Sequence, residues 1–463
     1  MNESASTSHG CLLRITRAVP HILSRRRQLE GKDILGMKTP LAALVLLTLP
    51  FSSSALTEFE TVLNSYGKLR TAAGRGLIRS KGVNGWALAM EGGNAVDAEL
   101  SRPHMTMADQ VGNLYIADKD AHAIRKVTPY GTIYTIAGTG EAGFNDDGIG
   151  IESQLDQPNG LYTLPDGTTY ILDLGNSRIR KLSTAGDLTT IVHDPDGIVL
   201  GRGLWVSDDE TLIYYACGNA VKKWAEAEGL TTYADGFTDL GNIDVDPLFW
   251  SLPVGNLVVT DRGANRVYRI FPDGSKQAIA GNGQTTGGGD GEKALETGLH
   301  GVRGICFAPN GGYYLATHEG GQVWYVDVNG YIHLLIDGDT SHTHAGDGED
   351  IKTPGRKISE PRAVTLAPNG DLIVTENDYG YVRVVERVFV ILDTTLDEVE
   401  GFTLTWSCVP EMNYKIEFKD DLSETTWQHL GDVPARGADI VTFFTDPAAA
   451  AKVKGFYRVA PVE

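Results

Sequence analysis

The sequence repeats one pattern, which reads GNLYIAD at residues 112–118, IRKV at 124–127 and GTIYTIAG at 131–138. Each copy also opens with an apolar stretch, so one copy supplies four short strands separated by Gly-rich turns. Units of four strands that recur along a chain are typical of the blades of a β-propeller. Two further clear copies lie at residues 167–192 and 255–281, and three weaker ones lie at 212–224, 313–326 and 371–385.

Six copies predict a six-bladed β-propeller over residues 66–390. The residues that end the second strand of each copy lie 43 to 59 residues apart, near the roughly 40 to 50 residues of a four-stranded blade with occasional long loops. Composition agrees with an all-β fold, because 55 Gly and 19 Pro residues suit frequent turns between short strands. The aligned residues are Asp118, Asp173, Ala216, Asp261, Thr317 and Glu376.

The clearest copies resemble the NHL-repeat propellers, whose signature strand reads YIAD…N.IRK. Residues 115–118, 173–181 and 261–269 match it, and the resemblance extends over about residues 66–390. It implies a ring of blades around a central channel. Related six-bladed propellers include gluconolactonase-like enzymes and the amidating lyase that cleaves peptidyl hydroxyglycines, and those enzymes hold a divalent metal in the channel.

The sixth copy ends near Val388 and lacks its fourth strand. Residues 66–74, which read YGKLRTAAG, have the form of that strand and precede the first copy. We therefore expect them to become the outer strand of the last blade, since this pairing covers an exposed sheet edge and closes the ring.

The repeat stops after Val390, and residues 391–463 are predicted to form a small β-sandwich. Residues 402–406, 414–418 and 441–444 alternate apolar and polar side chains, as half-buried strands do. The run LTW…Y.IE…DL…W…FYRV resembles a terminal module found on many secreted proteins of environmental bacteria. We interpret its aromatic side chains as core residues.

Residues 37–55 have the order of a secretory signal peptide. A charged start is followed by an apolar run at residues 41–49, and the small residues Ser53 and Ala55 precede a cut at Leu56. The run is shorter than the about 20 residues that span a bilayer as a helix, so no transmembrane helix is predicted in the mature chain. We expect export to the periplasm or out of the cell.

Residues 1–36 show no apolar periodicity and are expected to form no structured element. We interpret Met37 as the true start of translation. The alternative is a twin-arginine signal around residues 25–27, although the residues that follow depart from that motif.

Acidic residues outnumber basic ones: 60 Asp and Glu against 40 Lys and Arg give a formal net charge of −20. Nucleic acid and anionic membranes require cationic contact surfaces, so neither is expected as a partner. Cys217, Cys306 and Cys408 lie far apart without CxxC spacing, which favours buried free thiols over one disulfide with one free thiol.

One residue at the entry to each innermost strand is predicted to line the mouth of the channel. Arg presents a fork that suits carboxylate, sulfate or phosphate, so three guanidiniums, a histidine and two amides form an anion site there. In the alternative, the arginines are neutralised in a structural ring by the acids that end the second strands, namely Asp118, Asp173, Asp261 and Glu376. The predicted ligand-binding residues are His104, Asn159, Arg202, Asn242, Arg303 and Arg362.

Two functions remain open: an exported binding or scaffold protein for an anionic glycan, peptide or protein, and a metal-dependent hydrolase or lyase. The lactonase pattern needs Glu or Asp beside Asn, whereas the ring has Asn159 and Asn242 without a carboxylate, which favours binding. No metal site or cofactor is assigned. The acidic loops at residues 145–148, 289–292 and 346–350 lack EF-hand spacing and are interpreted as solvated turns. The run HTH at residues 342–344 is interpreted as an exposed loop.

Overall fold

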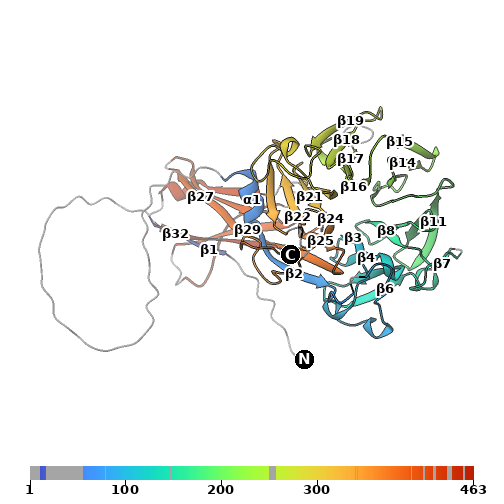
Figure 1. Ribbon diagram of the computed structural model, residues 1–463. Helices are drawn as coiled ribbons and strands as arrows, with labels where there is room; N and C mark the ends of the chain where they lie inside the picture. Colours follow the sequence, from blue (N-terminus) through green and yellow to red (C-terminus); the bar gives the residue numbers. More distant parts are fainter. Residues whose placement is uncertain are drawn as a thin grey trace, which may run out of the picture.

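Short antiparallel strands make up most of the computed structural model (Figure 1), which confirms the all-β prediction. The predicted signal peptide lies outside the described residues. The structure describes residues 11–16, 56–78, 80–145, 147–249, 257–338, 340, 343–397, 399–409, 412–420, 424–434, 441–451 and 454–462.

Six sheets follow the six copies of the repeat, and in the first five the four strands of the copy lie in sequence order across the sheet. The first sheet holds β3 (Pro103–Ala108), β4 (Leu114–Asp118), β5 (Ala123–Val127) and β6 (Ile133–Ala137). The second holds β8 (Pro158–Thr163), β9 (Thr169–Asp173), β10 (Arg178–Leu182) and β11 (Asp187–His193), with β7 (Gly148–Ile149) at its edge. The third holds β12 (Leu204–Val206), β13 (Leu212–Cys217), β14 (Ala220–Ala225) and β15 (Gly229–Ala234).

The fourth and fifth sheets have the same order, whereas the sixth takes its outer strand from before the first copy. The fourth holds β16 (Leu240–Val245), β17 (Leu257–Asp261), β18 (Arg266–Ile270) and β19 (Lys276–Ala280). The fifth holds β20 (Val302–Phe307), β21 (Tyr313–Thr317), β22 (Gln322–Val326) and β23 (Ile332–Ile336). The sixth holds β24 (Pro361–Leu366), β25 (Leu372–Glu376), β26 (Tyr381–Arg387) and β2 (Tyr66–Ala73).

The inner strands of the six sheets contact one another in a closed sequence: β3 with β8, then β12, β16, β20, β24 and β3 again. Apolar side chains fill the space between neighbouring sheets. One cluster joins Tyr115 and Ile124 of the first sheet to Leu161 and Ile171 of the second. Because most sheets face a neighbour on both sides, successive residues of the second strands are buried, as in β9.

The predicted closing strand is found in the sixth sheet, where β2 pairs antiparallel with β26. Leu69 of β2 is fully buried and lies opposite Val385. The Tyr66 hydroxyl lies 3.1 Å from the hydroxyl of Tyr314 in the fifth sheet. The strand that precedes the first copy in sequence therefore completes the last one.

Residues 391–462 contribute two further sheets. One holds β27 (Ile391–Asp397), β28 (Gly401–Ser407) and β31 (Val441–Asp446), and the other holds β29 (Asn413–Lys419), β30 (Gln428–Val433) and β32 (Lys454–Val462). Trp406, Tyr414 and Tyr457 are buried between them, as predicted for core aromatics. Trp427 is instead half-buried between Lys419 and Arg458.

Strand β1 (Cys11–Thr16) pairs antiparallel with β32 and extends the second of these sheets. The expectation that residues 1–36 form no element is therefore wrong for these six residues. An edge strand offers unpaired N–H and C=O groups to any extended segment that reaches it, so a short segment without marked periodicity pairs there.

Helices are short connections between the strands. The α-helix α1 (Glu58–Asn64) begins with a capping box formed by Thr57 and Glu60. None of the helices in the described ranges has the length and apolar character needed to cross a membrane. Cys217, Cys306 and Cys408 form no disulfide with one another. The short 3-10 helices are η1 (Leu88–Met90), η2 (Ala95–Asp97), η3 (Lys119–Ala121), η4 (Gly150–Glu152), η5 (Pro247–Phe249), η6 (Ala294–Glu296) and η7 (Pro447–Ala451).

Candidate functional site

The inner strands carry most of the predicted site residues at breaks in their pairing with the second strands. An extra residue in one strand is a β-bulge, which leaves that residue outside the ladder and re-aims its side chain. Arg202 lies two residues before β12 begins. The five residues at such register shifts are His104, Asn159, Asn242, Arg303 and Arg362.

The predicted cations lie close enough to affect one another's protonation. Burial, followed by the charges of Arg362, Arg202 and Arg262, lowers the pKa of Arg303 well below its usual value. Burial, followed by Arg362 and Arg303, also lowers the pKa of His104 well below its usual value. Burial lowers the pKa of Arg362 to about 10. Since like charges disfavour each other's charged forms, the structure brings these side chains to one place.

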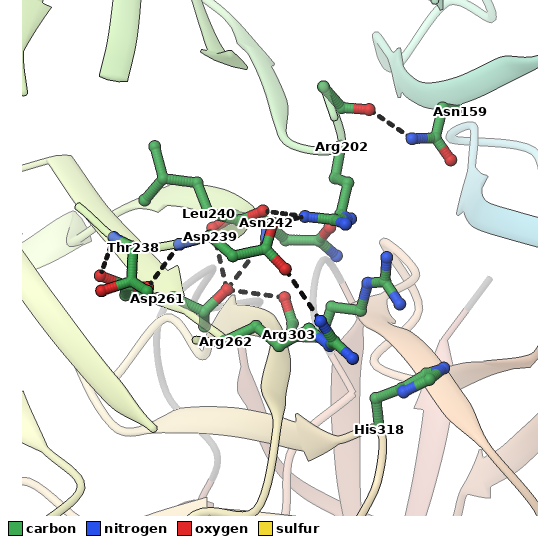
Figure 2. A network of polar contacts seen from close by, with 12 residues as sticks. Asn159, Arg202, Thr238, Asp239, Leu240, Asn242, Asp261, Arg262, Arg303 and His318 are labelled. Carbon is green, nitrogen blue, oxygen red and sulfur yellow. Dashed lines mark hydrogen bonds and ion pairs between the residues drawn. The ribbon is translucent and has the colours of Figure 1, made fainter. Parts of the chain in front are cut away.

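The two predicted amides are buried beside these cations. Asn159 donates its Nδ2 to the carbonyl oxygen of Gly201, the residue before Arg202 (Figure 2). The backbone N–H of Asn242 donates to the hydroxyl of Thr260 at 2.9 Å. The structure thus gathers all six predicted residues at one mouth of the ring of inner strands, and their binding of a ligand stays a prediction.

The acids that end the second strands do not neutralise these arginines. Asp261 accepts hydrogen bonds from the backbone N–H groups of residues 238–239 at 2.8 and 2.9 Å. Asp118, Asp173 and Glu376 likewise accept from backbone N–H groups of the loops that enter their own inner strands. The structural-ring hypothesis is wrong about these four acids, because their oxygens hold the loops.

The Arg of the IRK motif pairs with the same acids from the third strand. Arg125 lies 3.1 Å from Asp118, and Arg383 lies 3.1 Å from Glu376. All four side chains are buried. The acid and the arginine are therefore partners inside the first, second and sixth sheets, whereas the fourth sheet has Tyr268 at the position of the arginine.

Acids from loops pair with the basic side chains at the mouth instead. Asp239 contacts both Arg202 and Arg262, the latter at 2.9 Å. Glu360 lies 3.5 Å from Arg362. The remaining ion pairs are Arg102 with Asp378 at 3.1 Å and with Asp120 at 3.6 Å, Lys119 with Asp120 at 3.9 Å, and Arg262 with Glu319.

Arg303 differs from the other basic residues of the mouth, because its guanidinium has no hydrogen bond or ion pair with any residue that the structure describes. The residue is only 5% exposed. Its contact in Figure 2 is made by the backbone, whose carbonyl oxygen accepts from the Thr260 hydroxyl at 2.7 Å. Six basic side chains here face five carboxylates, and Arg303 carries the unmatched charge. A buried cation without a partner is costly, so this position favours a bound anion.

His318 links two of the acids at the mouth. Its Nδ1 lies 3.2 Å from Glu319 and its Nε2 lies 2.9 Å from Glu360. Burial lowers the pKa of His318, although both carboxylates act in the opposite direction. The imidazole therefore lies between the carboxylates that pair with Arg262 and Arg362.

Several residues of the mouth lie outside the predicted set. They occupy two further positions of each repeat, the residue just before the inner strand and the residue just after the second strand. The predicted set used one position per repeat, whereas a comparison of these two neighbouring positions across the copies identifies the same charged groups. The first position holds Arg102, Asp239 and Glu360, and the second holds Lys119, Arg262, His318 and Asn377.

The acidic loops do not behave as simple solvated turns. Asp147 accepts hydrogen bonds from the N–H and the hydroxyl of Thr190 in β11, both at 2.9 Å. Asp290 accepts from a backbone N–H of β23, and Asp347 accepts from one of β2. The bound N–H groups belong to residues that stay in register with the third strands, so these acids cover backbone groups at the outer edges of their sheets. Asp146, which belongs to the first loop, lies outside the described residues.

His344 is not part of an exposed loop, because its Nδ1 lies 3.1 Å from the buried carboxylate of Glu376 and its ring stacks on Tyr381. His342 lies outside the described residues. Within the part of the chain that the structure describes, no three His, Cys, Asp or Glu side chains gather in a way that would hold a metal ion.

Comparison with known proteins finds relatives for part of the chain. Residues 63–183 match the teneurin NHL domain family. The chain is 34% identical over 91 residues to the chloroplastic protein SUPPRESSOR OF QUENCHING 1 of Arabidopsis thaliana, covering 19% of this chain and 8% of that protein. It is 32% identical over 103 residues to human teneurin-1, covering 19% of this chain and 4% of that protein. The chain thus spans less than a tenth of the length of either relative.

A solved structure of a protein of unknown function from Bacteroides thetaiotaomicron is similar over 69% of this chain and 75% of its own, with a TM-score of 0.54 and 15% identity. At this identity the similarity concerns the fold alone. The repeated motif, the sheets built from it and the family match together show that this chain carries an NHL-repeat β-propeller.

Proposed function

We propose that this chain is an exported six-bladed propeller that binds an anionic ligand, presented by a glycan, a peptide or a protein, at the mouth of its channel. The propeller spans residues 66–390 and is closed by β2, and residues 391–463 form a small β-sandwich. The signal peptide at residues 37–55 is removed, and the mature protein acts in the periplasm or outside the cell.

The observation that carries this proposal is the guanidinium of Arg303, which belongs to a residue only 5% exposed and has no partner among the residues that the structure describes. Arg202, Arg262 and Arg362 all add positive charge at its position, and the carboxylates at the mouth are already engaged with other basic groups. An anion that accepts hydrogen bonds from Arg303 removes the cost of its isolation and gains a charge-assisted contact.

The charge distribution supports the same function. The chain has a formal net charge of −20, which opposes the approach of any anion to the molecule as a whole. An anion is therefore bound only where cations are concentrated, and the binding free energy depends on salt because salt screens the attraction between exposed charges.

Isothermal titration calorimetry of the parent protein and of Arg303→Met against galacturonate oligomers and sulfated glycans tests the proposal. Loss of a hydrogen bond to a charged group costs about 1.5–3 kcal/mol, or roughly a 10- to 150-fold weaker Kd. The matched control is Arg70→Met on β2, which removes an equal charge from an exposed ion pair with Glu386 of β26. We expect the control to bind within about twofold of the parent.

The parent should bind at least one of these anions, and its affinity should fall as salt rises. A parent that binds none of them, or an Arg303→Met variant that binds as tightly as the parent, contradicts the proposed function. Export is tested separately by sequencing the amino terminus of the secreted protein. A start well before Leu56 rejects the cleavage after Ala55, and only a start at or before Cys11 retains the whole of β1 in the secreted protein.

A further inference from the structure

The hydrogen-bonding groups left over at the mouth specify more than the sign of the ligand's charge. Besides the guanidinium of Arg303, the mouth contains N–H groups that donate no hydrogen bond to any described residue. The Nε atom of Arg362, the Nε atom of Arg262 and the Nδ2 atom of Asn242 are all buried and have no hydrogen-bond partner among the described residues. An inorganic anion such as sulfate, which only accepts hydrogen bonds, satisfies groups of this kind.

Acceptors are also left over, and an inorganic anion cannot satisfy them. Asn159 donates its Nδ2 to the carbonyl oxygen of Gly201, and Asn377 donates its Nδ2 to the carbonyl oxygen of Pro103 at 3.1 Å. Because only an NH2 group donates to a carbonyl, these contacts fix the orientation of both amides. Their Oδ1 atoms are consequently acceptors, and both are buried without a partner among the described residues.

Both amides belong to the mouth. Asn159 is the bulged residue of β8 beside Arg202 (Figure 2). Asn377 follows β25 directly and precedes Asp378, which pairs with Arg102. The two residues are 5% and 0% exposed, so bulk water does not satisfy their oxygens freely, and a buried acceptor without a donor is costly.

His104 adds a third acceptor. Burial and the nearby cations lower its pKa well below the usual value, so the imidazole is neutral at pH 7 and one ring nitrogen carries a lone pair. The described residues donate no hydrogen bond to it. The mouth thus combines an unpaired cation and spare donors with at least three spare acceptors.

We propose that the ligand is an acidic saccharide, in which one chemical group carries the charge and neighbouring hydroxyls donate hydrogen bonds. Its carboxylate accepts from Arg303, and its hydroxyls donate to Asn159, Asn377 and His104 while accepting from the spare N–H groups. A hydroxyl both donates and accepts, so a polyhydroxylated acid matches the mixed set of groups where a plain anion does not. This inference rests on the proposed anion-binding function and narrows its ligand.

Calorimetry with four small probes tests it on the parent protein: glucuronate, cyclohexanecarboxylate, sulfate and glucose. Glucuronate and cyclohexanecarboxylate both present a carboxylate on a six-membered ring, but only the first carries hydroxyls. Two or three additional hydrogen bonds of about 0.5–1.5 kcal/mol each make glucuronate at least about fivefold tighter than cyclohexanecarboxylate. Glucose, which lacks the charge, should bind at least tenfold more weakly than glucuronate.

A variant series locates the effect. Asn159→Leu should weaken glucuronate binding about fivefold and leave sulfate binding within twofold, whereas Arg303→Met should weaken both. The control is Asn145→Leu in an exposed loop, where both the Nδ2 and Oδ1 atoms already have partners. Circular dichroism and melting temperature establish that each variant is folded, and the comparison of probes on the parent does not depend on any variant.

The outcomes separate the two proposals. If cyclohexanecarboxylate or sulfate binds the parent as tightly as glucuronate, the acidic saccharide is rejected and the anion site stands. If glucose binds as tightly as glucuronate, or if no charged probe binds at all, the anion site itself is rejected. Equal weakening of glucuronate and sulfate by Asn159→Leu also overturns the assignment of the hydroxyl contacts.

Discussion

Replacing Arg303 by Met should stabilise the protein in the absence of ligand. The guanidinium has no described partner, so the substitution removes no hydrogen bond from the side chain, while the Met side chain retains most of the apolar stem that packs at the mouth. What disappears is a buried cation placed near Arg202, Arg262 and Arg362. A residue that lowers stability while it serves binding is expected at functional sites.

The size of the gain follows from general values. Replacement of buried charged groups by apolar ones of similar volume often stabilises a protein by about 1–4 kcal/mol. The lower half of that range applies here, because part of the packing volume is lost. A domain of about 325 residues has an unfolding entropy of roughly 0.7 kcal/mol per degree, so a gain of about 1–2 kcal/mol raises Tm by about 1.5–3 °C.

The matched comparison is Arg262→Met, for which the opposite sign is expected. Arg262 bonds both Asp239 and Glu319, so its removal leaves two half-buried carboxylates without that partner and should lower Tm by a few degrees. Differential scanning calorimetry at low salt and without ligand measures both variants. A lower Tm for Arg303→Met would refute the view that this cation is uncompensated, since a structural arginine stabilises the ring that contains it.

Two further predictions concern the ring and its pH dependence. Leu69→Ala in β2 should lower the free energy of unfolding by about 2–5 kcal/mol because the side chain is fully buried. The control is Arg70→Ala on the exposed face of the same strand, which should lower it by less than about 1 kcal/mol. Equal losses for the two variants in chemical denaturation would contradict the predicted closure. Burial raises the pKa of Asp173 to about 6, so the folded state binds this proton more tightly than the unfolded chain and Tm should rise as pH falls from 7 to about 5. Burial alone would raise the pKa of Glu319, but contacts from His318 and Arg262 lower it to about 2. The stability that the ionised Glu319 carboxylate contributes is therefore lost as pH falls below about 4.5. A Tm that declines steadily from pH 7 to 5 would contradict the effect expected from Asp173.

The regular part of the molecule could be predicted from the sequence because each sheet repeats the same local pattern. Strand positions followed from apolar stretches and Gly-rich turns, and the closing role of residues 66–74 followed from a strand missing at the other end of the repeat. The site residues could be predicted for a related reason. A position that recurs in each repeat recurs at the same place in each sheet, so six residues far apart in sequence were placed together.

The partners of those residues could not be predicted in the same way. Asp239, Glu319 and Glu360 come from loops, whose conformations depend on contacts with the neighbouring sheet rather than on local pattern. The acids of the second strands seemed to be the natural partners of the arginines, since both lie at the same ends of the strands. Their oxygens face the loop N–H groups instead, which only the β-bulges and the resulting turn geometry determine.

The two clear departures from the repeat coincide with two of the arginines at the mouth. The third and fifth sheets end their second strands with Cys217 and Thr317 in place of an acid, and these are the sheets that begin with Arg202 and Arg303. In the fifth sheet the Thr317 hydroxyl bonds Gln322 within its own hairpin, and it brings no negative charge toward the inner strand. The second-strand acids of the other sheets bind loop N–H groups and not the arginines of the mouth, so the missing acid does not by itself leave Arg303 without a partner. Arg202 belongs to the other sheet without such an acid and is nevertheless paired with Asp239 from a loop. What distinguishes Arg303 is therefore that no loop carboxylate of the described residues pairs with it, and the loops between the sheets rather than the repeat itself determine which cation is left for a ligand.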